Sequence, residues 1–577
     1  MFRAPSIMNT RRARQQVGTI TPLAVPFKGL NARDPFSVMG PEFALSLVNV
    51  FVETYGLRTR KGFSEWAAGL SNVPVSSLMS YYPAAALGSL VTYIGGSAVQ
   101  TTFDRMFVAA SSPIKPGVGA YSTAATARKL FAATGGSVYD VTNGGGAPWT
   151  PQIGIAGASD YWTSVNFNNI AGSFLCAVNN AGGYYIYNGT AWSHVTMGAA
   201  AGEVDGVDPD LFCFVTPWKH RLWFVEKDST RAWYLPTDQI TGVAKEFDFG
   251  PQFRHGGHLA ALANWTVDGG EGIDDYLIAV SSQGDVVIYK GTDPDIADAF
   301  SLHGVWYVGP LPAGRRMVNQ SGGDVYILSQ FGAMPVSKLL AAASLAALSQ
   351  QHLSYLVDPI IARLMQDFST LEGWQIVTIA KEEAILIGFP PEASPQGGDF
   401  LAFKTTTGAW STFKQTSYAS FAAVDADVFA GTKDGRVVRA FDGALDNVLI
   451  GTDVGDPIAC QVTPAYQPLG PPGAYKRFTL VRPSFLTTLT PKLTLQILVD
   501  YGPPKPTIVP TLPEISQSKW DVALWDTGRW SGLQAPIKEW LGTFGIGFAA
   551  TVQLDYLCGG DTLLTSIDFW EEPGGVM

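Results

Sequence analysis

A hairpin signature recurs along this chain roughly every 40 to 65 residues, a spacing that suits the blades of a β-propeller. Each copy has a short apolar strand, a tight turn containing glycine, and a second apolar strand. The clearest copies lie at 91–100, 130–141, 174–187, 277–289 and 428–441. Glycine supplies the positive φ that hairpin turns need, and the flanking β-branched and aromatic residues suit pleated strands. The repeat predicts an all-β fold built on a β-propeller.

Turn spacing and changes in composition divide the chain into parts. Turn signals run through residues 47–446 and predict a β-propeller of six to eight blades, with seven favoured. Residues 1–46 are rich in proline and locally basic, which indicates an N-terminal arm that becomes ordered against another molecule. Residues 447–577 have longer strands and a segment of spaced tryptophans, and they predict a separate C-terminal β-sandwich-like domain.

One stretch interrupts the propeller pattern. Apolar residues follow a helical period from 337 to 371, so we expect a helical insertion at 337–371. Asp358 is expected to cap the second helix, with Pro359 in its first turn. Such an insertion would either form a lid or docking surface or pack against the edge of a blade, and the sequence favours neither.

Composition limits the classes of protein to which the chain can belong. Only 15% of the 577 residues are charged and 46% are hydrophobic, so we expect partner molecules to cover part of the surface. A net charge of −11 argues against a conventional DNA-binding protein but does not exclude a protein past which DNA slides, because an acidic wall repels phosphate. The four cysteines have neither zinc nor redox spacing and are expected to be buried free thiols. No apolar window reaches about 18 residues, so no membrane-spanning segment is expected.

A search for catalytic and metal-binding patterns finds no complete motif. The turns lack the Ser-x-Asp-x-Gly-x-Thr-Trp repeat of sialidase propellers, and nothing in the sequence pairs two carboxylates across a glycosidic bond. His255 and His258 lack a third metal ligand at a recognised spacing. Nucleophile elbows and phosphate-binding glycine loops are also missing from the sequence. We therefore expect neither an enzyme nor a bound cofactor or metal ion.

Acidic residues gather in three loops. These residues would keep the loops soluble, bind calcium without an EF-hand pattern, or line an acidic passage. The first two loops are the candidates for lining a channel, and they contain Glu203, Asp205, Asp208 and Asp210, and Asp268, Glu271, Asp274 and Asp275. The third loop contains Asp293, Asp295 and Asp298.

Several segments are similar to segments of one family of viral structural proteins. The stretch at 216–236, which begins Thr-Pro-Trp-Lys-His-Arg-Leu-Trp-Phe, resembles a strand pair in tail proteins of short-tailed bacteriophages. Three further stretches are similar to the same family. The first is 49–62, and the second is 408–413 with 433–439. The third is 460–466 with 476–483, Asp500-Tyr501 and the Trp-Asp repeat after Lys519. Spread over most of residues 47–577, they resemble the podovirus tail nozzle protein of the tail tubular protein B type.

The resemblance implies a structural protein of the virion tail that is synthesised in the host cytoplasm. Nozzles of this family assemble as homo-hexamers below a ring-shaped tail adaptor, enclose the channel through which the phage genomic DNA leaves, and mount tail fibres or spikes. Six copies would carry six times −11, or −66, which suits a passage that DNA crosses without sequence-specific binding. Four basic residues of the arm would then either contact the adaptor or form a solvated end: Arg3, Arg11, Arg12 and Arg14.

A carbohydrate-binding or carbohydrate-active β-propeller is the alternative. Its support is the content of 16 Trp and 21 Tyr, because aromatic faces stack on sugars. The same aromatic residues would also be expected to fill the cores of propeller blades.

Overall fold

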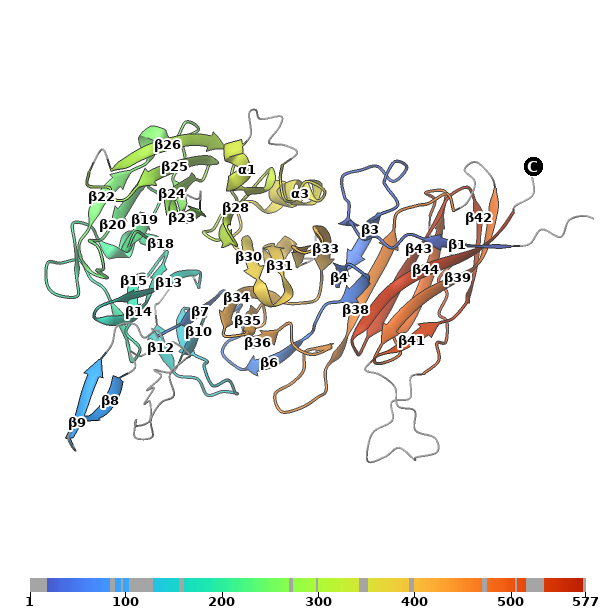
Figure 1. The fold of residues 1–577 in the computed structure, drawn as a ribbon, viewed down its shortest axis with the longest axis horizontal. Coiled ribbons are helices and arrows are strands. Elements are labelled where there is room, and N and C mark those ends of the chain that lie inside the picture. The colour runs from blue at the N-terminus through green and yellow to red at the C-terminus, as the bar shows by residue number, and fades with distance from the viewer. Residues whose placement is uncertain are drawn as a thin grey trace, which may run out of the picture.

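The computed structural model shows two β-rich modules side by side (Figure 1). A β-propeller occupies one side of the molecule and a β-sandwich the other, which confirms the all-β prediction. The residues that the structure describes are 18–83, 89–94, 97–102, 128–154, 160–268, 273–296, 299–341, 351–393, 399–469, 475–503, 506–514 and 534–573.

Six groups of four antiparallel strands form blades of the propeller; five are separate sheets and the sixth belongs to a ten-stranded sheet. From the inner to the outer strand, three of them are β7 (Ser77–Tyr81), β10 (Lys129–Thr134), β11 (Ser137–Asp140) and β12 (Pro151–Gly154); β13 (Trp162–Asn169), β14 (Gly172–Asn179), β15 (Gly183–Tyr187) and β16 (Trp192–His194); and β18 (Phe212–Trp218), β19 (Arg221–Glu226), β20 (Arg231–Tyr234) and β22 (Lys245–Asp248). The other three are β23 (Leu259–Asp268), β24 (Ile273–Ser281), β25 (Asp285–Gly291) and β26 (Phe300–Tyr307); β30 (Gln375–Ile379), β31 (Ala384–Gly388), β32 (Phe400–Lys404) and β33 (Ala409–Phe413); and β34 (Tyr418–Val424), β35 (Asp427–Thr432), β36 (Val437–Ala440) and β6 (Phe63–Ala67).

A three-stranded sheet holds one further place in the ring. It consists of β27 (Val318–Ser321), β28 (Asp324–Ser329) and β29 (Gly332–Pro335), and β27 contacts both β23 and β30. The ring closes because β7 contacts β34, and because β6, from the N-terminal side, pairs with β36 in the last blade. The six four-stranded blades lie within the predicted range of six to eight.

Most of the glycine hairpins in the sequence are the second and third strands of blades. The copies at 130–141, 174–187, 277–289 and 428–441 are β10–β11, β14–β15, β24–β25 and β35–β36. In the third of these, Gly284 has a φ of 93°, and the backbone of Gly309 leaves no room for a Cβ atom. The copy at 91–100 differs, because it forms the separate hairpin β8 (Ser89–Ile94) and β9 (Ser97–Thr102) between β7 and β10.

The helical insertion predicted at 337–371 is present as α1 (Val336–Ala341) and α3 (Asp358–Phe368). Pro359 lies in the first turn of α3 as predicted, but Asp358 is not the cap. Its carboxylate instead accepts hydrogen bonds from Ser354 Oγ at 2.5 Å and from His352 Nδ1 at 3.0 Å. The buried face of α3 packs against the β30–β33 blade through Ile361, Leu364 and Met365.

Two sheets packed on a common core form the sandwich. The first contains β1 (Thr19–Leu23), β4 (Val50–Glu53), β5 (Gly56–Thr59), β39 (Lys476–Thr487), β41 (Ala535–Lys538), β42 (Leu541–Gly547) and β44 (Thr562–Pro573). The second contains β2 (Gly29–Leu30), β3 (Phe43–Val48), β38 (Asp456–Pro464), β40 (Lys492–Val499) and β43 (Ala550–Cys558), and it continues into a blade because β2 and β3 pair with β33. The short strand β37 (Leu445–Asp446) pairs with the beginning of β38.

The predicted N-terminal arm at 1–46 is corrected for the residues from 18 onward. β1 pairs with β44, with Thr19 opposite Glu571, and β3 pairs with β38 in the middle of a sheet. Ala44 and Leu47 of β3 are fully buried in the sandwich core. The sandwich thus contains residues 19–59 together with the C-terminal part of the chain. The paired strands are more than 400 positions apart in the sequence, so local composition does not reveal that they pair.

Candidate functional site at the joint between the modules

A buried ion pair lies where the propeller meets the sandwich. The side chain of Arg60, which follows β5, is 1% exposed, and that of Asp446 in β37 is 8% exposed. Arg60 Nη1 and Nη2 donate to the two carboxylate oxygens of Asp446 at 2.8 and 2.6 Å, and Nε donates to Asn49 Oδ1 at 3.0 Å. Burial alone lowers the pKa of Arg60, but the hydrogen bonds and charge of Asp446 outweigh it and raise that pKa. The guanidinium therefore stays charged inside the protein.

Asn49 lies at the corner where the chain passes from one sandwich sheet to the other. Its φ is 57°, a left-handed conformation that asparagine tolerates better than most residues. Its N–H donates to Thr412 O at 2.9 Å, and its Nδ2 donates to Ala459 O at 2.7 Å. Its Oδ1 also accepts from Lys414 N at 2.9 Å. One residue thus connects β4, β33 and β38.

A second ionic cluster joins the sandwich to the β30–β33 blade. Arg58 of β5 donates to Glu382 Oε2 at 2.7 Å and to Glu53 Oε1 at 3.1 Å. Lys404 of β32 donates to Glu382 O at 2.8 Å.

The two modules also share apolar contacts. Phe51 of β4 lies in the propeller core, with its ring edge-to-face on Phe413 at 5.1 Å. Shared strands, shared core and buried charges make the joint rigid.

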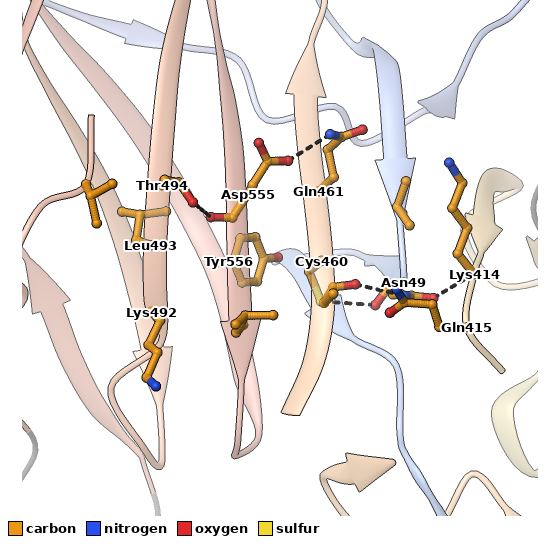
Figure 2. A pocket seen from close by; sticks show the side chains of 14 residues that line it. Asn49, Lys414, Gln415, Cys460, Gln461, Lys492, Leu493, Thr494, Asp555 and Tyr556 are labelled. Carbon is orange, nitrogen blue, oxygen red and sulfur yellow. Dashed lines mark hydrogen bonds between the residues drawn. The ribbon is translucent and has the colours of Figure 1, made fainter. Parts of the chain in front are cut away.

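A groove of about 390 Å³ opens beside this joint (Figure 2). Asn49, Lys414 and Gln415 lie on one side, and residues of β38, β43 and β40 lie on the other. Lys414 and Lys492 are exposed, and neither forms an ion pair with any described residue. The groove therefore combines two exposed lysines with the carboxylate of Asp555 and a mostly apolar lining.

Two arginines close the propeller axis at one end. Arg315 donates to two carbonyls at the start of β23 at 3.0 Å each, and Arg316 donates to Ser76 O at 2.7 Å and Trp162 O at 3.2 Å. Between them and Glu372 a cavity of only about 20 Å³ remains, near the volume that one water occupies. Burial lowers the pKa of Arg316. The disc therefore offers no wide axial channel at this level.

In the first acidic loop, each carboxylate has a hydrogen-bond partner close to it. Glu203 Oε2 accepts from Ala200 N at 2.9 Å, and Asp205 accepts from Gly206 N at 2.8 Å. Asp208 caps a short 3-10 turn by accepting from Asp210 N at 3.1 Å. Within this loop β17 (Val204–Asp205) pairs with β21 (Gly242–Val243). The Asp210 carboxylate lies 2.9 Å from His194 Nε2.

The second acidic loop lies at the other end of the blades. Asp275 of β24 accepts from Lys219 Nζ at 2.6 Å, and Lys219 follows the last residue of β18. The first acidic loop ends just before Phe212, which is the first residue of β18. A strand of seven residues is roughly 23 Å long, so the two loops lie about that distance apart. Asp268 and Asp274 lie at the end of β23 and the start of β24, and Glu271 lies outside the described residues. The two loops therefore face opposite sides of the disc.

The third acidic loop is neutralised by basic residues. Asp293 lies 3.1 Å from Arg221 Nη2, and Asp295 accepts from Lys245 Nζ at 2.8 Å; Asp298 is outside the described residues. Across the described ranges, no group of three or more His, Cys, Asp or Glu side chains could hold a metal ion.

The other predicted features have clear positions. His255 Nδ1 lies 2.7 Å from Asp285 Oδ1, which gives it a structural partner. Arg3, Arg11, Arg12 and Arg14 lie outside the described residues. All four cysteines are free and buried, as predicted: Cys176, Cys213, Cys460 and Cys558. No helix in the described ranges is long and apolar enough to cross a bilayer.

Comparisons with known proteins find a structural likeness but no family. No protein-family model matches the sequence, and no curated protein matches it. Among solved structures, the computationally designed Ika8 protein is 12% identical, with a TM-score of 0.32 over 66% of this chain and 99% of that one. An exo-β-1,3-galactanase from Phanerochaete chrysosporium is 10% identical, with a TM-score of 0.23 over 70% and 95%. A glycoside hydrolase family 43 arabinoxylan arabinofuranohydrolase from Bacillus subtilis is 11% identical, with a TM-score of 0.24 over 88% and 95%.

These comparisons correct the prediction that the chain is not an enzyme. Two of the similar structures are glycoside hydrolases, so a propeller gives no ground for excluding catalysis. At these identities and TM-scores the likeness assigns neither an activity nor a substrate to this chain.

Sequence reasoning missed the buried charges at the joint. Arg60 lies in the segment 49–62, and Asp446 is the last residue of the predicted propeller region 47–446. Their separation of 386 positions gives no local signal of pairing. No pattern around Arg60 gives such a signal, because the strand before it contains a second charged residue, Arg58.

Proposed function

We propose that this chain is the nozzle subunit of a short-tailed bacteriophage tail, a virion protein that assembles as a homo-hexamer. In this role it binds the tail adaptor, mounts fibres or spikes, and surrounds the path of the phage genomic DNA. The supporting observation is where four of the resembling segments lie in the fold, whereas the segment at 216–236 lies in the blade that contains β18, β19 and β20. Segments 49–62, 408–413, 460–466 and 476–483 contain β4 with β5, β33, β38 and β39, the strands that build the joint and the adjoining sandwich sheets.

A rigid two-module subunit suits a ring. Subunits around a hollow axis must keep one shape, because a flexible joint would spread each contact over many geometries. The Arg60–Asp446 pair and the strand pairing of β33 with β2 and β3 supply that rigidity. Since Arg315 and Arg316 close the propeller axis, the DNA path in this proposal runs between copies.

The charge of the chain agrees with this path. Each copy carries −11, and its acidic loops lie at both ends of β18. Screening limits the repulsion of phosphates to about 8 Å at physiological salt, so only carboxylates close to the bore act on DNA. In this proposal Asp205 and Asp208, which have no basic partner among the described residues, are the stronger candidates for that wall.

The adaptor contact is assigned to the N-terminal end of the sandwich. β1 begins at Thr19, opposite Glu571, so the described part of the chain enters the first sheet at that end. The basic residues Arg3, Arg11, Arg12 and Arg14 would meet an acidic adaptor surface there.

Native mass spectrometry and electron microscopy of the concentrated, purified chain test the proposal. We expect particles of six copies with six-fold symmetry around an open axis. The proposal would be refuted if the purified chain stayed monomeric at all concentrations and the virion contained a single copy of it. Deletion of residues 1–16 should leave the ring intact and abolish its binding to the adaptor.

A further inference from the structure

The loop 447–455 between β37 and β38 presents apolar side chains to solvent. Leu449, Ile450 and Val454 are 51%, 46% and 72% exposed, although a soluble surface rarely places three such side chains on one short loop. Asp453 lies among them and is exposed. The loop thus combines an apolar tip with one negative charge.

The tip is held in a defined shape. Thr452 N donates to Leu449 O at 3.1 Å, and Gly451 between them has a φ of 75°. Asn447 Nδ2 donates to Asp456 Oδ2 at 3.0 Å across the base of the loop. A preorganised loop loses little conformational entropy when it binds, which favours a role in docking.

An apolar pocket of about 400 Å³ lies beside α3. The ring of Phe331 at its wall is 47% exposed, and Met334 in the same pocket is buried. The remaining apolar part of the lining comes from Tyr307, Val308, Pro359 and Ala362. This lining suits aliphatic side chains rather than a charged ligand.

One exposed cation lies at the edge of this pocket. The guanidinium of Arg33 stacks on the Tyr355 ring at 3.9 Å and forms no ion pair with any residue in the described ranges. Asp358 also lines the pocket, but its carboxylate is bound by His352 and Ser354. The backbone beside Arg33 is anchored, because Ala32 N donates to Leu356 O at 2.9 Å. The pocket is therefore apolar with a positive edge, the complement of the loop.

A single chain cannot bring the loop into its own pocket. The loop is bound to β6, since Glu65 N donates to Val448 O at 2.7 Å. In Figure 1, β6 lies below the blade that contains β30, β31 and β33, and α3 lies above it. A second copy can supply the loop, because two different surfaces on opposite sides of one subunit make a head-to-tail contact.

We propose that loop 447–455 of one copy docks into the α3 pocket of the next copy. Leu449, Ile450 and Val454 then cover Phe331, and Asp453 lies beside Arg33. The contact rests on the proposed ring and names the surfaces that form it. Repeated with a rotation that closes, a head-to-tail contact of this kind produces a closed ring.

Disulfide crosslinking tests the docking directly. In the full chain carrying Arg33→Cys and Asp453→Cys, a disulfide forms only where the two Cα atoms come within about 7 Å. The native cysteines are buried, so they do not interfere. We expect a ladder of crosslinked species up to the ring on a non-reducing gel. Arg33→Cys with Ile170→Cys is the matched control, since Ile170 is fully exposed on a different turn.

Charge exchange gives a second, independent measurement. Asp453→Arg and Arg33→Glu alone should each weaken association about tenfold or more, and the double variant should restore it. Val454→Asp should also prevent association, whereas Ile170→Asp should not. Thermal unfolding of each variant as a monomer should match the wild type, because these side chains are exposed.

The outcomes separate this docking from the proposed function. Suppose that the wild-type protein forms a six-copy ring, but the variant carrying Arg33→Cys and Asp453→Cys gives no crosslink and charge exchange gives no rescue. That result overturns the docking and leaves the nozzle proposal in place. A ladder that ends at two copies overturns the head-to-tail arrangement. Binding of an oligosaccharide that is lost in Phe331→Ala, without any change in association, would instead assign the pocket to a sugar and overturn the docking.

Discussion

Removal of the Asp446 carboxylate is the sharpest test of the joint. Among the described residues, Asp446→Ala leaves the Arg60 guanidinium with Asn49 Oδ1 and Lys61 O as acceptors, inside a site where its side chain is 1% exposed. Breaking a buried ion pair from one side costs about 3–5 kcal/mol of unfolding free energy, because the remaining charge is uncompensated. We expect Asp446→Ala to lose an amount in this range.

The adjacent residue provides a matched control. Lys61 pairs with Asp561 at 2.7 Å, but these side chains are 32% and 48% exposed. Exposed pairs contribute about 0–1 kcal/mol, so Asp561→Ala should be nearly neutral. The double variant Arg60→Met/Asp446→Leu should recover most of the loss of Asp446→Ala, because it removes both charges and refills the space.

Urea unfolding followed by the fluorescence of the 16 tryptophans measures these differences. A chain of two modules need not unfold in one transition, so hydrogen exchange in β5 and β38 should be measured as the local free energy of the joint. Equal losses in Asp446→Ala and Asp561→Ala would refute the reasoning. A double variant no more stable than Asp446→Ala would refute it as well.

Three further predictions follow from single sites. Asn49→Ala should destabilise the joint by about 1 kcal/mol more than Asn49→Gly in urea unfolding, because alanine does not tolerate a φ of 57°. Burial alone raises the pKa of Asp275, but its hydrogen bond with Lys219 outweighs burial and lowers that pKa. The stability difference between wild type and Asp275→Asn should therefore be full above a pH of about 4 and vanish as the pH falls through the lowered pKa. Both Cys176 and Cys213 are buried, and burial raises the pKa of Cys176 to about 12 and of Cys213 to about 11, so a thiol reagent at neutral pH should label neither of them until the chain is unfolded.

Local sequence patterns predicted the propeller well. Period-two strands around a glycine turn form blades at most of their occurrences, because the turn geometry and the buried faces are both encoded within about 15 residues. The same signature at 91–100 formed a hairpin outside the blades, since a hairpin pattern does not specify which sheet it joins. The helical period at 353–365 likewise predicted α3, and its packing against a blade followed only from the fold.

The candidate site was much less accessible to sequence reasoning. Arg60 and Asp446, or Arg58 and Glu382, are brought together from more than 300 positions apart, and each alone resembles an ordinary charged residue. The acidic loops appeared equivalent in sequence, yet β18 separates the first two and basic side chains neutralise the third.

The amino-acid order by itself determined the hairpins, the burial of the thiols and the acidic balance, because each depends on neighbours in the chain or on composition alone. The tertiary structure alone decided that residues 19–59 complete the sandwich, that two arginines close the propeller axis, and that a buried ion pair holds the modules together. Those features depend on contacts between distant segments, whose free energy arises only when water is excluded between them.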